Sequence, residues 1–373
     1  MKSIVPFIFL TIFLGIITGA VIYLTHRFNW YFSIPYTRML YPVFAVLALF
    51  MMFGVFTTAN SVSLAGHIIY ILAAMTMGLM LYLLISVILT DILRLFTGFK
   101  PLTYGLIVVI LTLVINLAGT LNSWNTKVTH HTIPIKGLTQ TVRAMHLSDV
   151  HLGHFRGKRF LHKLVSKTNA QNPDIVFITG DLFDGRYRLS KKDLQPLTDL
   201  NAPVCFIEGN HDKYTGVQTI KNMLRELGIQ VLENNMTGFK DLQIIGLNHM
   251  AADDQTFNVH TQNGHATIKS TLDKLSPDKS KPTVLLHHSP DGIKYASKHG
   301  VDLYLSGHTH AGQLVPIKYI AALMFQFNQG LHHYSGTTMF VSQGAGTFGP
   351  PIRLGTISEI SLLTLQPEYL QAE

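Results

Sequence analysis

Four long apolar stretches in the first third of the chain constrain its fold more than any other feature. Each has close to the roughly 20 residues that a helix needs to cross about 30 Å of hydrocarbon, and no Lys, Arg, Asp or Glu interrupts any of the four. They are residues 4–24, 39–58, 67–89 and 104–121. A soluble core would require four successive helices with almost no polar face. We therefore expect four membrane spans.

The first stretch also resembles a secretory signal peptide, because Lys2 precedes its apolar core. That core is long, has no clear small-residue cleavage site and is followed by three more apolar stretches. We therefore expect the first stretch to be retained as a span. Aromatic residues lie near the ends of the stretches, where amphipathic rings prefer the membrane interface: Trp30, Tyr31, Tyr36, Tyr41 and Trp124.

The basic residues between the spans predict their orientation. The first and third connecting loops carry two such residues each and the second carries none: Arg27, Arg38, Arg94 and Lys100. The positive-inside rule then places the first and third loops in the cytoplasm and both termini outside. Three basic residues oppose this arrangement, because they flank the bundle on the proposed outer side: Lys2, Lys127 and Lys136. The loops favour an extracytoplasmic C-terminal domain.

From about residue 127 the sequence changes to short β-rich segments separated by Gly, Asn, Asp and His. We expect buried strands at residues 142–147, 175–179, 204–207, 242–247, 283–286, 301–305, 339–342 and 357–365. Residues 158–168 and 217–227 have helical spacing. Such alternation predicts α/β layering. We therefore divide the chain into a transmembrane helical region, residues 1–126, and an α/β domain, residues 127–373.

Charge and cysteine content exclude several kinds of site. The formal charge is +8, but the sequence contains no dense basic run and no basic helix with interleaved aromatic residues. We therefore do not expect nucleic acid as a partner; the positive charge suits a solvated surface close to lipid head groups. The single cysteine, Cys205, excludes an intrachain disulfide framework and a Cys-rich zinc site.

Potential metal ligands directly follow five of the expected strands. In chain order they are Asp149 and His151, then Asp181, then Asn210, His211 and Asp212, then His287 and His288, and last His308 and His310. The carboxyl ends of strands in an open α/β sheet form one edge, where ligand crevices arise. One such pair alone is usually an ordinary surface feature, but five together indicate a common site. Carboxylate, imidazole and amide ligands without thiolate suit two divalent ions, Mn²⁺, Zn²⁺ or Fe, better than Ca²⁺ or Mg²⁺.

These motifs resemble the series of the calcineurin-like metallophosphoesterase superfamily: D-x-H, G-D-x-x-D, G-N-H-D, a lone His and G-H-T-H. The chain has SDVHLG, GDLFD, GNHD, LLHHSPD and SGHTHAGQ in that order, over roughly residues 145–353. Its closing VSQGAGTFGPPIRLG looks like a subgroup whose members often carry membrane or export segments, some of which cleave lipid-linked phosphoesters. The resemblance implies a metallophosphoesterase α/β/β/α sandwich after the N-terminal four-helix transmembrane bundle.

The resemblance also implies a set of metal ligands. Asp149, His151 and His310 would hold the first metal, Asn210, His288 and His308 the second, and Asp181 would bridge the two. Between the neighbours His287 and His288, the spacing to Ser-Pro-Asp favours His288. Two such metals lower the pKa of a bound water and hold the phosphoryl oxygens, so no protein nucleophile is required.

His211 and Asp212 are the catalytic residues that the resemblance implies. His211 lies beside the ligand Asn210, is not itself a ligand, and would protonate the leaving oxygen or stabilise its developing charge. Asp212 would orient the His211 ring, and Asp184 would support the loop that carries Asp181. Turn or helix capping is the alternative for both of these acidic residues.

The substrate-binding residues are less defined by the sequence. Three arginines are candidates to contact a substrate phosphate, or else are simply exposed: Arg186, Arg188 and Arg353. The apolar residues 319–327 suggest a core helix or, alternatively, a segment packed against lipid near the site. After the strand at 242–247 the family commonly has an acidic pair, whereas this chain has Asn248 and His249, which leaves the substrate-side loop undefined.

We therefore expect a membrane-anchored, metal-dependent phosphoric ester hydrolase that acts on a phosphomonoester or phosphodiester. The substrate would be a phosphorylated small molecule or lipid, and tethering to a membrane favours a lipid or cell-envelope compound. One alternative is a membrane-tethered nucleotide phosphodiesterase or nuclease that uses the same metals. The other is a non-catalytic metal-binding scaffold, which the completeness of the motif set argues against.

Overall fold

The computed structural model describes residues 5–255 and 266–368. The chain divides into two compact units, Met1–Leu121 with Gly349–Ile352, and Asn122–Phe348 with Arg353–Glu373. Lys2 and residue 4, where the first apolar stretch begins, lie outside the described residues. The predicted division into domains at residue 126 stays a prediction.

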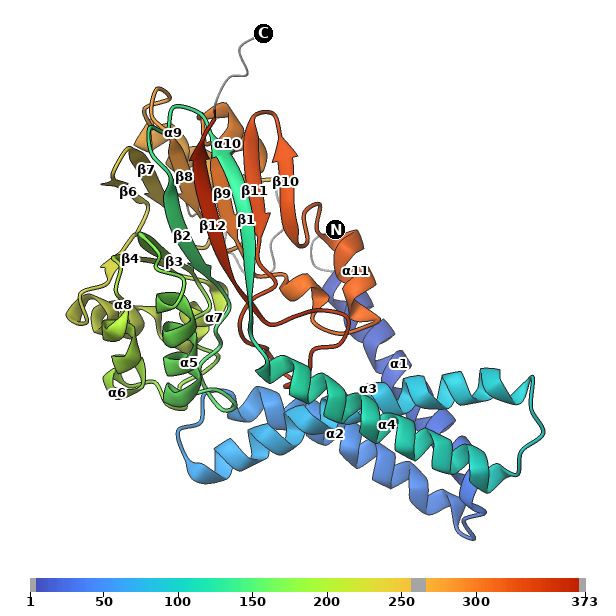
Figure 1. Cartoon of the computed structure of the whole chain (residues 1–373). Helices are drawn as coiled ribbons and strands as arrows, with labels where there is room; N and C mark the ends of the chain where they lie inside the picture. The colour runs from blue at the N-terminus through green and yellow to red at the C-terminus, as the bar shows by residue number, and fades with distance from the viewer. Residues whose placement is uncertain (1–4, 256–265, 369–373) are drawn as a thin grey trace. The chain divides into compact units, whose positions relative to one another are not determined.

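Four long helices make up most of the first unit and are blue to green in Figure 1: α1 Val5–Phe32, α2 Leu40–Thr58, α3 Leu64–Arg94 and α4 Pro101–Trp124. All four are long and apolar enough to cross a membrane. The bundle buries a small core of its own that includes Leu24, Phe44 and Val108. Many outward apolar side chains remain exposed, as expected for helices that face lipid. The prediction of four apolar helices is confirmed.

The second unit is built on two six-stranded sheets. The first has the order β1-β12-β2-β3-β4-β5 and comprises β1 Lys127–Ile135, β2 Val142–Leu147, β3 Ile175–Thr179, β4 Val204–Ile207, β5 Gln230–Val231 and β12 Glu359–Pro367. The second has the order β10-β11-β9-β8-β7-β6 and comprises β6 Asn235–Phe239, β7 Leu242–Gly246, β8 Thr283–Leu286, β9 Leu303–Ser306, β10 Gly330–Tyr334 and β11 Thr337–Val341.

Both sheets are mixed, with a parallel centre. Strands β2, β3 and β4 run parallel in the first sheet, and β7, β8 and β9 run parallel in the second. Strand β12 is antiparallel to β2, and β10 is antiparallel to β11. Each sheet therefore has one edge at which the carboxyl ends of its central strands lie together.

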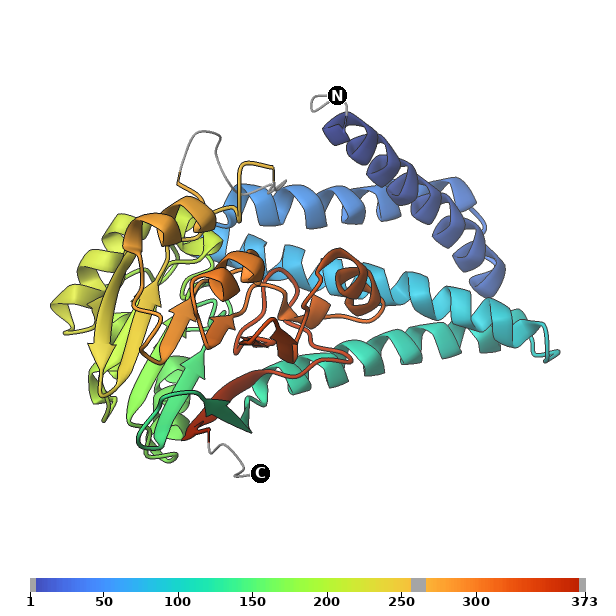
Figure 2. The ribbon, with the colours of Figure 1, turned by 90° about the horizontal axis from the view of Figure 1, so that it is seen from above.

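Helices cover the outer faces of the two sheets (Figures 1 and 2). The helices of this unit are α5 Lys158–Asn169, α6 Lys191–Leu194, α7 Asn210–Thr215, α8 Val217–Glu226, α9 Ile268–Leu275, α10 Ile293–Lys298 and α11 Ile317–Met324, with short 3-10 turns at Gln195–Asp199 and His310–Gly312. Apolar residues of α5 and α8 belong to the core outside the first sheet, and those of α9 and α10 to the core outside the second. The layers are thus α/β/β/α.

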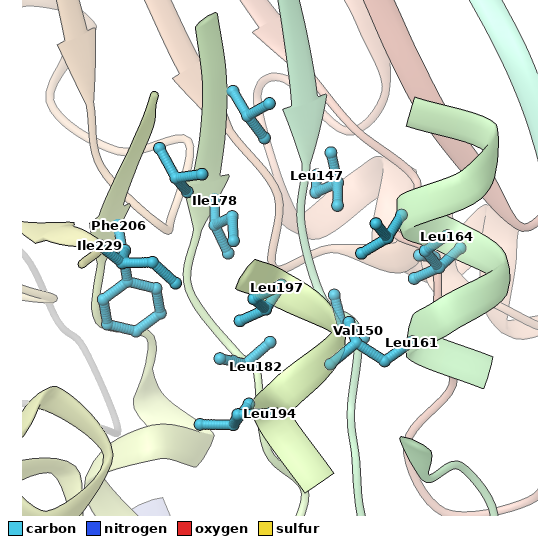
Figure 3. Packing of buried hydrophobic residues seen from close by; sticks show 14 of the residues in the cluster. Leu147, Val150, Leu161, Leu164, Ile178, Leu182, Leu194, Leu197, Phe206 and Ile229 are labelled. Atoms are coloured by element: carbon cyan, nitrogen blue, oxygen red, sulfur yellow. The ribbon is translucent and has the colours of Figure 1, made fainter. Parts of the chain in front are cut away.

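The central strands alternate between two apolar layers. In β3, Ile175 and Phe177 point into the core between the sheets, whereas Val176 and Ile178 point to the helical layer. Figure 3 shows Ile178 in that outer layer, together with Leu161 and Leu164 of α5. Because both faces of the strand are buried, its sequence reads as a continuous apolar run. Burial of both faces holds the central strands in place, and their carboxyl ends carry the ionisable residues.

The predicted fold class, a transmembrane-type helical bundle followed by a metallophosphoesterase sandwich, is confirmed. Four expected strands match β2, β3, β4 and β8 in their bounds, and the other four differ from β7, β9, β11 and β12 by one or two residues at one or both ends. Strands β1, β5, β6 and β10 were not predicted, because each has exposed or half-buried positions and no continuous apolar run.

The core-helix interpretation of residues 319–327 is wrong. In α11 only Ala321 is buried. The side chains of Tyr319 and Leu323 are 64% and 89% exposed. This helix presents its apolar residues on the surface of the second unit, which the alternative interpretation, contact with lipid, allows.

Candidate metal centre

Loops at the carboxyl ends of five strands carry the residues selected from the sequence. Each strand is buried and is followed within a few residues by a possible ligand: β2 by Asp149 and His151, β3 by Asp181, β4 by Asn210, β8 by His288, and β9 by His308 and His310. The parallel strands bring the loops of each sheet to its own carboxyl edge, and contacts between the two sets, such as that of His151 with His310 at 3.0 Å, join them. The structure therefore brings together residues that lie far apart in the sequence.

Asp149, His151 and His310 form the first cluster of possible ligands. Each offers a nitrogen or oxygen atom, and these atoms lie within 4.8 Å of one another. The Nε2 atoms of His151 and His310 are 3.0 Å apart, and Nε2 of His310 lies 3.4 Å from Oδ1 of Asp149. Burial lowers the pKa of His310 well below its usual value, with the charge of His151 acting in the same direction. A neutral imidazole keeps the lone pair that a cation needs.

Asp181, His288 and His308 form a second cluster, also within 4.8 Å. Nε2 of His288 lies 3.1 Å from Oδ2 of Asp181. Its other ring nitrogen, Nδ1, hydrogen-bonds the Thr179 carbonyl oxygen at 2.8 Å, which fixes the ring. Nε2 of His288 is thereby directed into the cluster.

His287 has a structural environment instead. Its Nδ1 lies 2.8 Å from the Ser289 carbonyl oxygen and 2.9 Å from the Tyr304 hydroxyl, and its Nε2 accepts from the Met250 amide at 3.3 Å. Both ring nitrogens are therefore engaged away from the carboxylates. This geometry favours His288 over His287 as the possible ligand.

Asn210 opens α7 directly after the Gly209 that follows β4. The residue is buried, and within the described part of the chain its Oδ1 has no hydrogen-bond partner. A buried amide oxygen without a partner is costly, on the order of 1–3 kcal/mol. A cation would satisfy this oxygen.

The backbone at the site is strained. Asp149, His151, Asp181, His308 and His310 all have φ between +48° and +71°, in the left-handed region. Such conformations are uncommon for residues with a Cβ and cost on the order of 1 kcal/mol or more each. Five of the seven predicted ligands share this feature. Strain gathered in this way is typical of functional sites, where the surrounding structure holds side chains in fixed directions.

Glycines beside the carboxylates leave no space for a side chain. A Cβ on Gly209 would lie 2.1 Å from Oδ1 of Asp181, and one on Gly307 would lie 2.1 Å from Oδ2 of Asp149. The backbone at each glycine therefore lies so close to a carboxylate that only a residue without a Cβ fits there. This explains physically why both the G-N-H-D and G-H-T-H segments begin with glycine.

Asp184 holds the rings of two histidines. Its Oδ1 lies 2.8 Å from Nδ1 of His211 and 3.4 Å from Nδ1 of His151. Burial raises the pKa of the Asp184 carboxyl, but its interactions with the His151 and His211 rings lower it below its usual value. The sequence interpretation gave the orienting role to Asp212. The structure differs, because Asp184 is the residue that bonds the His211 ring.

Asp212 contacts backbone amides. Its Oδ1 accepts from Phe183 at 3.1 Å and its Oδ2 from Gly209 at 2.9 Å, at the start of α7. Burial, with the charge of Asp181, raises the pKa of Asp212 to about 7. These contacts match the capping alternative and brace the loop that follows β3. The catalytic assignment of Asp212 stays a prediction.

The electrostatics of the protein groups favour a charged His211. Burial lowers the pKa of the His211 imidazole, but the negative charges of Asp181 and Asp184 outweigh it and raise the pKa to about 10. Burial raises the pKa of Asp181, but the positive charges of His288 and His211 lower it well below its usual value. Burial lowers the pKa of His288, but the negative charge of Asp181 outweighs burial and raises that pKa to about 9. A cation bound at His288 would compete with that proton.

The three arginines considered from the sequence lie in different environments. Arg353 is fully buried: its Nε donates to the Gly346 carbonyl, and its Nη2 donates to the carbonyls of Gln343 and Gly346 and lies 3.1 Å from Nδ1 of His310. It therefore braces the loop beside the first cluster and is not exposed to substrate. Arg186 and Arg188 are exposed.

Phe348 was not identified from the sequence. Its ring centroid lies 5.2 Å from that of His310, 6.1 Å from that of His211 and 6.3 Å from that of His151. The side chain is 45% exposed. Gln313 holds its backbone, accepting from the Phe348 amide and donating to the Phe348 carbonyl. An exposed aromatic ring thus borders the first cluster.

His249 was noted only as a departure from the family pattern. It is buried, its ring centroid is 5.7 Å from that of His288 and 5.8 Å from that of His308, and neither ring nitrogen has a partner among the described residues. Burial lowers its pKa well below the usual value. A neutral histidine therefore adjoins the second cluster.

Comparisons with known proteins agree with this geometry. The Calcineurin-like phosphoesterase family model matches residues 142–312. The chain is 34% identical over 247 residues to an uncharacterized metallophosphoesterase of Helicobacter pylori, covering 65% of this chain and 64% of that protein. It is 33% identical over 274 residues to a transmembrane protein with metallophosphoesterase domain of Bos taurus, covering 69% of this chain and 61% of that protein.

A shorter relative is matched over most of its length. The chain is 31% identical over 230 residues to an uncharacterized metallophosphoesterase of Aquifex aeolicus, covering 60% of this chain and 85% of that protein. Identity at this level over so large a share of a relative, together with the motif series at the strand ends, establishes the relationship. The chain belongs to the calcineurin-like metallophosphoesterase family.

Proposed function

We propose that this protein is a membrane-anchored phosphoesterase with two divalent metal ions, which hydrolyses a phosphomonoester or phosphodiester of a lipid or cell-envelope compound. One observation carries the proposal: two clusters of carboxylate and imidazole groups meet at the carboxyl ends of strands from both sheets. Phosphoester hydrolysis needs concentrated positive charge and an activated water, and such clusters suit both requirements.

The donor set fits two cations. Asp149, His151 and His310 would hold the first, and His288, His308 and Asn210 the second. Asp181 would contact both, since its Oδ2 lies 3.9 Å from Nε2 of His151 and 3.1 Å from Nε2 of His288. Mixed nitrogen and oxygen donors favour Mn²⁺, Zn²⁺ or Fe. Two such ions would supply charge for the phosphoryl oxygens and lower the pKa of a bound water.

His211 would act as the general acid. Its Nδ1 is bonded to Asp184, so Nε2 is the nitrogen left to face the substrate, and the side chain is 29% exposed. The hydrogen bond to Asp184 favours the protonated form of this ring. The ring then donates the Nε2 proton to the leaving oxygen, while the Nδ1–H bond to Asp184 is kept in both states.

A lipid substrate is supported by the surface next to the site. Phe325, directly after α11, has its ring centroid 5.9 Å from that of His308. The exposed apolar residues of α11 continue from this point: Ile317, Tyr319, Ile320, Leu323 and Met324. An exposed apolar helix in a chain with four candidate membrane spans is suited to contact lipid. A phosphoester at the membrane surface would lie close to such a helix.

The catalytic domain is proposed to be extracytoplasmic, on the charge distribution of the loops between the spans. To test this, Cys205, which is buried, is replaced by Ala and a cysteine is introduced at the exposed Lys269. Labelling by an impermeant maleimide in intact cells is the expected result. Labelling only after the membrane is permeabilised would place the domain in the cytoplasm.

The activity test uses the purified full-length protein supplied with Mn²⁺ or Zn²⁺. Turnover is measured with an aryl phosphate, a nucleotide diester and a lipid phosphoester. Asp181→Ala should abolish both turnover and metal retention, because its carboxylate would contact both metals. Asp199→Ala removes an exposed carboxylate outside the clusters and should leave both unchanged.

The alternatives give different results in the same assays. Strong selectivity for the nucleotide diester or nucleic acid would show that the substrate is a nucleotide compound and not a lipid. Absence of metal-dependent turnover on every substrate, with metal still bound, would indicate a scaffold. Either result would leave the membership of the family unchanged.

A further inference from the structure

A cavity of the Asn122–Phe348 unit, separate from the metal-ligand clusters, is bordered mainly by positive charge. Its volume is ≈830 Å³, and it shares no lining residue with the two metal-ligand clusters. Trp124, Phe155 and Phe160 form part of its wall. The charged residues that line it are five basic and one acidic: Lys158, Arg159, Lys163, Lys167, Arg188 and Asp193.

The positive charge of this cavity is not neutralised by the protein. Among the residues that the structure describes, Lys158, Arg159 and Lys163 form no ion pair, and Nζ of Lys167 donates to the Thr126 carbonyl. The one carboxylate, Asp193, accepts instead from the Ser190 hydroxyl. An anion in the cavity would therefore meet cations without partners.

The spacing of the cations on α5 is unfavourable without such an anion. Arg159, Lys163 and Lys167 lie four residues apart, so they occupy one side of the helix as neighbours. Like charges at this spacing destabilise a helix. The arrangement is accounted for if a negative group binds along that side.

Arg188 is held over the cavity by its backbone. Its φ is +66°, in the left-handed region that a residue with a Cβ rarely adopts. Its Nη1 would lie 2.1 Å from a Cβ on Gly157, so the guanidinium occupies the space that this glycine leaves open. Backbone strain of this kind gathers at functional sites, ligand clamps among them.

Trp124 connects the cavity to the end of a candidate span. It is the last residue of α4, whose 24 residues rise about 36 Å, a little more than the roughly 30 Å of a hydrocarbon core. The Arg156 guanidinium lies 5.2 Å from its ring, and Phe160 contacts the ring edge-on at 6.1 Å. Trp at such a position lies at the level of the lipid head groups.

We propose that this cavity binds the phosphate-bearing head group of an anionic lipid. The charge, the unpaired cations and the continuity of Trp124 with α4 all point to a ligand that is negative and located at the membrane surface. The bound lipid is not the substrate of the metal centre. The proposal therefore does not depend on the phosphoesterase activity.

The test uses Trp124 as the reporter in the full-length protein, held in a neutral detergent. The sequence has two tryptophans, so Trp30→Phe leaves Trp124 as the only one. Its fluorescence is titrated with dihexanoyl phosphatidylglycerol, with dihexanoyl phosphatidylcholine and with inorganic phosphate. We expect saturable binding of phosphatidylglycerol at least ten-fold tighter than that of the other two.

Two double variants separate specific binding from net charge. Lys158→Gln with Lys163→Gln removes two cavity cations and should weaken phosphatidylglycerol binding by roughly 25-fold, about five-fold for each. Lys269→Gln with Lys274→Gln removes the same charge from exposed positions of α9 and should leave the affinity unchanged. Equal weakening by both pairs would overturn the proposal. Equal binding of phosphatidylcholine or phosphate, or no response to any of the three, would overturn it as well.

Discussion

Gly307→Ala tests whether the close approach of backbone to carboxylate sets the geometry of the metal centre. The added Cβ would lie 2.0 Å from Oγ of Ser148 and 2.1 Å from Oδ2 of Asp149. Both neighbours are fully buried. The Asp149 carboxylate also accepts from the His308 amide at 3.1 Å through each oxygen. The carboxylate therefore cannot move without losing contacts.

The size of the effect follows from these distances. An ordinary carbon–oxygen contact requires Asp149 to move by about 1 Å or more. A displacement of about 1 Å at a reacting centre costs roughly 100-fold in rate, or about 2.7 kcal/mol. Loss of a hydrogen bond to the charged Asp149 carboxylate would also lower the free energy of unfolding by about 1.5–3 kcal/mol. We expect kcat/KM to fall by about 100-fold or more, with weaker binding of the first metal.

The assay compares Gly307→Ala with Gly238→Ala in the full-length protein. A Cβ on Gly238 would have its nearest neighbour, the Leu242 carbonyl oxygen, at 3.9 Å, so this control adds the same methyl group without a clash. Aryl phosphate hydrolysis and bound Mn²⁺ per chain are measured for both, with circular dichroism to confirm folding. Equal activity and equal metal content in the two variants would refute the reasoning.

Three further changes probe the groups around the clusters. His211→Ala should retain metal but lose about 10²–10⁴-fold in kcat on an alkyl phosphate, with a smaller loss on a nitrophenyl phosphate whose leaving group needs no proton; equal losses on the two substrates would contradict the acid role. Asp184→Asn removes the charge 2.8 Å from Nδ1 of His211 and should lower kcat by about 10–100-fold, measured beside the exposed Asp199→Asn, which should have no effect. Phe348→Ala should raise KM for a bulky apolar ester more than KM for a small alkyl phosphate, because its exposed ring borders three site histidines; an equal change on both would contradict a role in substrate contact.

The strands that position the site were predictable because they are buried on both faces. A continuous apolar run such as β3 can bury both faces only between two layers, and an ionisable residue directly after it must lie at the sheet edge. That rule brings the loops of one sheet together, but the meeting of the loops of the two sheets, such as the approach of His288 to Asp181 at 3.1 Å, did not follow from it. Edge strands were not predictable in this way, because half-exposed β6 and β10 carry no comparable run.

Contacts between side chains could not be predicted from the sequence. Asp184 and Asp212 are both acidic residues near a motif glycine, and only the folded loops determine that Asp184 bonds His211 while Asp212 accepts from backbone amides. Arg353 is a long charged side chain, which is usually exposed, yet carbonyl oxygens satisfy it in a buried position. The core-helix interpretation of α11 was wrong for the opposite reason, since an apolar segment is usually buried, and only the alternative of contact with lipid allows its exposure.

The central claim is that the strand-end loops hold two metal ions. The most direct test is anomalous diffraction from crystals of the full-length protein grown with Mn²⁺. The account predicts two peaks per chain, one bonded by Asp149, His151 and His310 and the other by His288 and His308, with Asp181 in contact with both. No peak within bonding distance of either Asp149 or Asp181, at saturating Mn²⁺, would contradict it.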